Sequence, residues 1–107
     1  MEKMTPAQEE KLVYVLKLLK AASYDLCDAI EGGGMMSDAK TAVYDAYTAV
    51  QSDNVLPPDI KAALLAHTSA SWNAITALKS TDERLGDSIF HIGESERYLK
   101  RLAQGAK

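Results

Sequence analysis

Apolar side chains recur at steps of three and four residues in four separate segments of the chain, and this spacing limits the possible folds more than any other feature. Such steps gather side chains on one face of a helix with about 3.6 residues per turn, whereas a strand alternates every second residue. No strand-like alternation of any length interrupts the pattern. The sequence therefore predicts an all-α fold.

The ends of the first predicted helix are marked by residues that favour a start and a stop. Thr5 and Gln8 have the spacing of a capping box, and Pro6 stands at the first helical position, where its missing N–H is not needed. The glycines at 32–34 end the segment, because glycine enters the left-handed conformation cheaply and is costly inside a helix. We expect this helix over residues 6–31.

Three further helices follow from similar signals. Ser37 before Asp38 is a favourable start for a helix over 38–51, because the hydroxyl can cap free N–H groups. Pro58 opens a helix over 58–79 after the turn-forming segment 52–57. Ser80 and Glu83 repeat the capping-box spacing before a helix over 81–104.

Each predicted helix has an apolar face that would turn inward. On the first helix these positions are Leu12, Leu16, Leu19, Ser23, Leu26 and Ile30, and on the second they are Ala39, Ala42, Val43, Ala46, Tyr47 and Val50. On the third they are Ile60, Leu64, His67, Ser71, Ala74 and Leu78, widened by Leu65, Trp72 and Ile75, and on the fourth they are Leu85, Ile89, Ile92, Leu99 and Leu102. Short connections keep successive helices adjacent, so the prediction is a four-helix antiparallel bundle. A length of 107 residues suits a single helical domain over 1–107.

Charge and cysteine content narrow the classes of partner and the compartment. The net charge is −3, whereas nucleic-acid binders usually need a basic face, so we expect no nucleic-acid partner. The single cysteine, Cys27, can form no internal disulfide, and the residues after Met1 lack the apolar run of a signal peptide. The longest bulky apolar stretch, 12–19, is far shorter than the ~20 residues that span a bilayer. These observations predict a cytoplasmic protein without a membrane segment.

One column on the fourth helix has the residue types of a hydrolase triad. Asp87, His91 and Ser95 follow one another at four-residue steps. A nucleophile also needs oxyanion donors, and the N–H groups of a regular helix are already bonded to its own carbonyls. We interpret the column as a solvated helix face with a local contact between Asp87 and His91, and we expect no catalytic residues and no enzyme activity.

Metal and cofactor sites also lack their usual spacings. Helix bundles that bind iron or manganese use Glu-x-x-His pairs, but Leu64 and Ser88 stand three residues before the two histidines. His67, on the apolar stripe, is interpreted as a core histidine, with a pH-sensing role as the alternative. Cys27 is interpreted as a packing residue. We therefore expect no metal and no cofactor.

The strongest functional indication is the segment 12–19, which is apolar on all sides except at Lys17. On a surface helix of a monomer one side should be polar, so both faces of this helix favour burial. Either the segment is covered within its own bundle, or it contacts another molecule. Tyrosines and the Met35–Met36 pair add area typical of interfaces, although the methionines could equally close the bundle end. The expected protein-interface residues are Val13, Tyr14, Leu18, Tyr24, Met35 and Met36.

The sequence thus favours a small non-enzymatic regulator that binds a larger protein target through a helical surface, as an antagonist, anti-activator or adaptor. Self-association as a homodimer through the first helix is part of this hypothesis. Acidic positions Asp25, Asp28 and Glu31 could receive Lys or Arg from the partner. The alternative is a small-ligand or nucleotide-binding helical protein with a pocket between helices or subunits. Its candidate walls are Tyr44, Tyr47, Trp72, His67, Arg97, Lys100 and Arg101.

Overall fold

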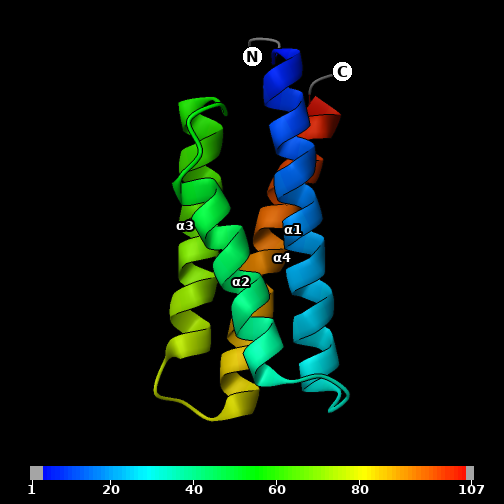
Figure 1. Ribbon diagram of the computed structural model, residues 1–107, viewed down its shortest axis with the longest axis vertical. Coiled ribbons are helices and arrows are strands. Elements are labelled where there is room, and N and C mark those ends of the chain that lie inside the picture. Colours follow the sequence, from blue (N-terminus) through cyan, green and yellow to red (C-terminus); the bar gives the residue numbers. More distant parts are fainter. Residues whose placement is uncertain (1–3, 106–107) are drawn as a thin grey trace.

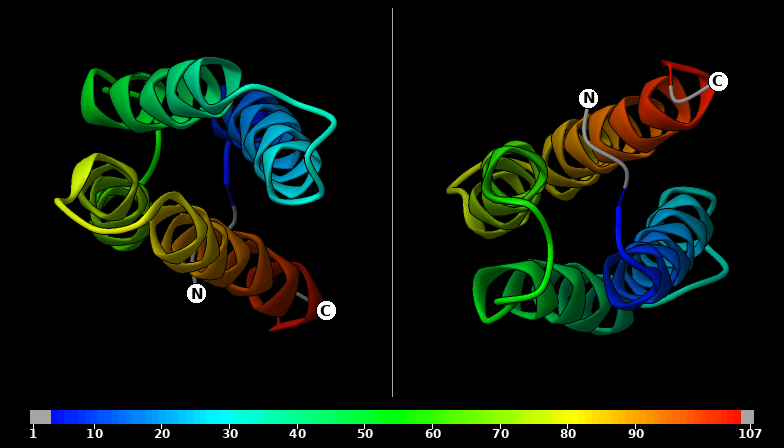
Figure 2. Two further views of the ribbon diagram at one scale, coloured as in Figure 1. Left: turned by 90° about the horizontal axis from the view of Figure 1, so that it is seen from below. Right: turned by 90° about the horizontal axis from the view of Figure 1, so that it is seen from above.

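The computed structural model describes residues 4–105, which form four α-helices in an antiparallel bundle (Figure 1). The helices are α1 (Pro6–Ile30), α2 (Met36–Gln51), α3 (Pro58–Thr76) and α4 (Thr81–Gly105). Each helix packs on two neighbours: α1 and α3 both contact α2 and α4. Seen end-on, the helices stand at the corners of a four-sided bundle whose long dimension is 43 Å (Figure 2). The predicted all-α four-helix bundle is confirmed.

The predicted start of α1 is confirmed in detail. The Thr5 hydroxyl accepts a hydrogen bond from the Gln8 N–H at 3.2 Å, and the Gln8 side chain accepts one from the Thr5 N–H at 2.9 Å. After the helix ends, the N–H groups of Gly33 and Gly34 both donate to the Asp28 carbonyl. Gly32 has a φ of +86°, a conformation that favours glycine. The glycine segment is therefore a helix stop, as predicted.

Two predicted boundaries are wrong by two or three residues. Helix α2 begins at Met36 instead of residue 38, and its N-cap Met35 makes no side-chain hydrogen bond, so Ser37 is not the cap. The side chain of Met36 packs against the core, and this contact accounts for the early start. Helix α3 ends at Thr76 instead of residue 79. Close to this end, the Arg84 guanidinium of α4 donates a hydrogen bond to the carbonyl of Ile75 at 3.4 Å. The predicted start of α4 at residue 81 is confirmed, and the Glu83 N–H donates to the Ser80 hydroxyl at 3.3 Å.

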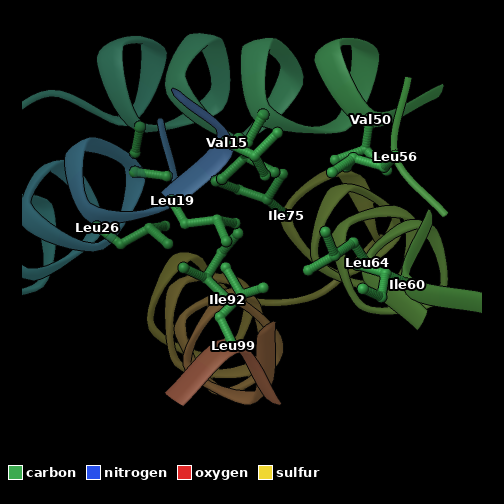
Figure 3. Close-up of a cluster of buried hydrophobic side chains, with 14 of the residues drawn as sticks. Val15, Leu19, Leu26, Val50, Leu56, Ile60, Leu64, Ile75, Ile92 and Leu99 are labelled. Atoms are coloured by element: carbon green, nitrogen blue, oxygen red, sulfur yellow. The ribbon is translucent and has the colours of Figure 1, made fainter. Parts of the chain in front are cut away.

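The buried positions of all four helices follow steps of three and four residues, which is the spacing of knobs-into-holes packing. These positions are Val15, Leu19, Ala22 and Leu26 of α1, Ala39, Val43, Ala46 and Val50 of α2, Ile60, Leu64, Thr68, Ser71 and Ile75 of α3, and Leu85, Ser88, Ile92, Ser95 and Leu99 of α4. In Figure 3 the larger apolar members from all four helices point into one shared interior.

The predicted faces are rotated on two of the helices. On α3, Thr68 is buried where His67 was expected, and the His67 side chain is only half-buried. The predicted core position Leu78 is fully exposed, because α3 ends before it. On α1, Ile30 is exposed and Val15 takes the central place, with Leu12 and Leu16 packed beside it.

Hydroxyl groups occupy part of the core between α3 and α4. Ser71 and Ser88 lie with their Oγ atoms 2.6 Å apart, and each hydroxyl also lies within hydrogen-bond distance of the other residue's carbonyl, at 3.0 and 3.1 Å. Small side chains allow the two helix backbones to approach closely, and the reciprocal bonds satisfy both buried hydroxyls. These bonds link α3 and α4 at one specific register.

The connection between α2 and α3 is held by the buried carboxylate of Asp53. Its Oδ2 accepts hydrogen bonds from the N–H groups of Val55 and Leu56 at 3.1 and 2.8 Å. The Lys61 ammonium donates to the Asp53 carbonyl, and the Lys11 ammonium lies 3.9 Å from Oδ1. The predicted loop is therefore an ordered turn that ties α1 and α3 to the same residue.

None of the helices formed by residues 4–105 is long and apolar enough to cross a membrane.

Candidate interaction surface

The column on α4 does not assemble a triad. Asp87 is exposed and its carboxylate lies 3.3 Å from the Lys79 ammonium, so the expected contact with His91 is replaced by an ion pair across the α3–α4 connection. The His91 ring lies edge-on to Phe90, with ring centroids 5.3 Å apart. Ser95 is fully buried and its Oγ has no hydrogen-bond partner among the described residues, so the prediction of a solvated column is wrong at this position. A buried hydroxyl without an adjacent base is not placed to attack a substrate.

Within residues 4–105, no three His, Cys, Asp or Glu side chains gather in a way that could hold a metal ion. Cys27 is half-buried and free.

His67 is half-buried and is one of the groups whose charge acts on Glu94 of α4. The Glu94 carboxylate accepts a hydrogen bond from Arg97 at 2.8 Å. This bond, with the charges of Arg97, His67 and Arg101, lowers the pKa of Glu94 below its ordinary value, against a smaller opposing effect of desolvation. Glu94 and Arg97, three residues apart on α4, therefore form an ion pair. Glu96 and Lys100 have a helical spacing that would also allow a pair, but they form none in the part of the chain that the structure describes.

The six predicted interface residues fall in three different places. Val13 and Tyr24 are 67% and 70% exposed and lie on the side of α1 that faces away from the core. At about 100° per residue, both are more than a third of a turn from the buried stripe of Val15 and Leu19. They are two exposed apolar side chains on a face of α1 that also carries the exposed Lys17 and Lys20.

Tyr14 and Leu18 lie on the flank of α1 that meets α2. Tyr14 is 50% exposed, and Leu18 is half-buried against the core. Two adjoining hollows of about 350 and 360 Å³ run along the α1–α2 seam and share Leu18 and Asp45 as lining residues. We call this continuous depression the α1–α2 groove.

Met35 and Met36 lie at the end of the bundle where α1 connects to α2. Met35 is 65% exposed, whereas Met36 packs partly into the core. Met36 therefore fits the interpretation that the pair closes the bundle end, whereas Met35 remains accessible to a partner.

Carboxylates from both helices line the α1–α2 groove. Asp25 of α1 and Asp38 and Asp45 of α2 surround a floor that includes Leu18, Ala21 and Ala42. None of the three aspartates takes part in an ion pair within residues 4–105. The sequence indicated Asp25 as a possible acceptor for a partner's cation, but Asp38 and Asp45 were missed. They belong to another helix, and only the packing of α2 on α1 brings them to the same groove.

A second depression lies on the α2–α3 side of the bundle. Its lining combines Tyr44 and Trp72, whose ring centroids are 5.1 Å apart, with Ser37, Lys40 and Thr41. Tyr44 and Trp72 were both candidate ligand walls, so the structure brings two members of that predicted set together. The other members of that set do not line this depression.

No protein-family model matches the chain, no curated protein is similar to it, and no solved structure resembles it at a significant level.

Proposed function

We propose that the chain is a small protein-binding regulator, an adaptor or antagonist, that receives a basic amphipathic segment of a larger protein in the α1–α2 groove. The observation that carries the proposal is the combination of an apolar floor and carboxylates without ion-pair partners in this groove. An amphipathic helix binds such a groove by placing apolar side chains at three- and four-residue steps on the floor.

The apolar part of the surface supports a macromolecular partner. Tyr14 is half-exposed at one end of the groove, and Leu18 lies at its centre. Tyrosine provides a large contact area with a polar hydroxyl, and it is enriched where proteins meet. Alanines on the floor let the backbone of a partner helix approach closely.

The charges determine the chemistry of the partner. Asp38 and Asp45 are two helical turns apart on α2, about 10.5 Å along the axis, and Asp25 lies across the groove. Lys or Arg side chains on both flanks of an incoming helix could reach these carboxylates. Complementary charge of this kind speeds association and selects among partners more than it adds affinity.

Self-association through Val13 and Tyr24 is a second part of the proposal. These residues lie away from the groove, so a dimer formed through them would leave the groove open. Light scattering coupled to size-exclusion chromatography tests this part separately, with Val13→Ser and Tyr24→Ser expected to convert a dimer to a monomer. A wild-type protein that is monomeric at high concentration would contradict it.

Binding to a synthetic peptide tests the groove. The probe is a fluorescein-labelled amphipathic peptide of about 18 residues, five helical turns, built from Leu at three- and four-residue steps and Lys elsewhere. We expect saturable binding by fluorescence anisotropy and roughly tenfold weaker binding to the Asp38→Asn, Asp45→Asn double variant, the equivalent of ~1.4 kcal/mol. Higher salt should reduce this difference because it screens exposed charges.

Matched controls separate a groove from a general effect of net charge. The Asp82→Asn, Glu96→Gln double variant removes the same charge from α4, which does not contact α2. It should bind the peptide like the wild type. Tyr14→Ser, at a half-exposed position that the fold tolerates, should weaken binding as well. Equal losses in the groove and control variants, or no binding, would overturn the proposal.

A further inference from the structure

The depression between α2 and α3 combines two aromatic rings and one cation in a small area. The half-exposed ring of Tyr44 and the partly buried ring of Trp72 meet at an interplanar angle of 58°, and Lys40 lies one helical turn before Tyr44 on α2. The depression has a volume of about 460 Å³, within the range of small-molecule sites. Its walls come from two helices.

Two residues of this depression, Lys40 and Trp72, have side chains that can only donate hydrogen bonds. Lys40 forms no ion pair among the described residues, and the Trp72 indole N–H has no hydrogen-bond acceptor there. The Thr41 hydroxyl already donates to the Ser37 carbonyl at 3.0 Å. No carboxylate lines the depression, although acidic residues outnumber basic ones in the chain. It therefore suits an acceptor with negative charge.

The ring pair does more than cover the seam between α2 and α3. Tyr44 is 48% exposed, whereas Tyr47, one turn further along α2, is half-buried. Aromatic faces left accessible beside a lysine are the groups that bind a flat ring by stacking and its charged substituent by a salt link.

We propose that the depression formed by Tyr44, Trp72 and Lys40 is a binding site for a small planar aromatic anion, such as a nucleoside monophosphate or an aromatic sulfonate. The ring of the ligand packs against Trp72 and Tyr44, and its anionic group contacts the Lys40 ammonium. This site lies on the side of α2 that meets α3. Thr41 lines both the site and the α1–α2 groove, but the three residues proposed to contact the ligand do not line the groove, so the proposal does not depend on the partner of that groove.

Trp72 is the single tryptophan of the chain, so its fluorescence reports on this site directly. The probes are adenosine 5′-monophosphate and anthraquinone-2-sulfonate at constant ionic strength, with adenosine as the uncharged match for the first. We expect saturable quenching by both anions and roughly tenfold weaker binding of adenosine, since a factor of ten is the size of one modest ionic contact.

Three variants locate the binding. Lys40→Gln should reduce the affinity for the nucleotide to that for adenosine and leave adenosine binding unchanged. Tyr44→Ser should weaken both. Lys20→Gln, an exposed lysine on α1, should change neither. Circular dichroism should confirm that all three variants keep the wild-type helix content.

The outcomes are distinguishable from those for the groove. Lack of saturable quenching by both anions, or equal effects of Lys40→Gln and Lys20→Gln, would overturn this proposal and leave the peptide-binding groove untouched. Conversely, the Asp38→Asn, Asp45→Asn double variant should quench like the wild type even if it no longer binds the peptide.

Discussion

The α1–α2 pair and the α3–α4 pair bury different chemistry. All buried positions of α1 and α2 are Ala, Val or Leu, whereas Thr68, Ser71, Ser88 and Ser95 bring hydroxyls into the core on the other side. The outer rims are also different: Glu94 beside α3 is paired with Arg97, but the aspartates of the α1–α2 groove have no ion pair within residues 4–105.

This difference indicates two ways of holding a helix pair. Apolar packing between α1 and α2 depends on filled volume and is tolerant of small rotations, because dispersion and burial are not directional. The hydrogen bonds between Ser71 and Ser88 are directional, so they specify one register of α3 on α4. The Glu94–Arg97 ion pair lies within α4 itself, three residues apart, whereas the aspartates between α1 and α2 line an accessible groove.

The largest effect should come from a cavity in the apolar pair. Leu19→Ala removes a fully buried side chain and should lower the free energy of unfolding by about 3 kcal/mol. Val13→Ala, at a largely exposed position of the same helix, should change it by less than about 0.5 kcal/mol. Urea denaturation followed by circular dichroism measures both. Similar values for the two variants would show that α1 packs through a different face.

The serine pair should give a smaller effect with a measurable coupling. Ser71→Ala and Ser88→Ala should each lower the free energy of unfolding by about 1 kcal/mol, the usual net value of a buried hydrogen bond. The double variant should lose less than the sum, because the hydroxyl–hydroxyl contact is already absent in either single variant. Strict additivity in the double-mutant cycle would contradict a direct bond.

Ser95 of α4 differs from Ser71 and Ser88, although all three serines are buried in the same helix pair. Its buried hydroxyl has no partner among the described residues, and burying a polar group without one is costly. Ser95→Ala should therefore leave the free energy of unfolding unchanged or raise it by up to about 1 kcal/mol. A loss as large as that of Ser88→Ala would show that Ser95 forms a bond comparable with those of the serine pair.

The smallest expected effect concerns the ion pair between Glu94 and Arg97 on α4. Because the Arg97 hydrogen bond lowers the folded-state pKa of Glu94, ionised Glu94 stabilises the fold above the ordinary glutamate pKa. This contribution is lost as the pH falls through the lowered folded-state pKa. Titration by NMR should find the pKa of Glu94 below that of an unperturbed glutamate, and Arg97→Gln should raise it. An unchanged value in the variant would exclude Arg97 as the cause.

Much of the fold could be predicted because its signals are local. The signals that begin and end the helices act on residues close to them in the sequence. They are the capping box of Thr5 and Gln8, the glycines at 32–34 and the cap at Ser80. The steps of three and four residues likewise show which segments form amphipathic helices. The start of α2 at Met36 was mispredicted because it depends on a core contact, not on a local cap.

The sequence by itself determined the number, order and approximate limits of the helices, since helix caps and periodicity arise from neighbouring residues. Only the tertiary structure decided how each helix is rotated. The segment 12–19 is apolar on nearly every side, and therefore only contact with α2 and α4 could select Val15 over Leu12 and Leu16 as the buried centre. The tertiary structure also creates the acidic groove, because its carboxylates come from two helices that meet only when the core forms.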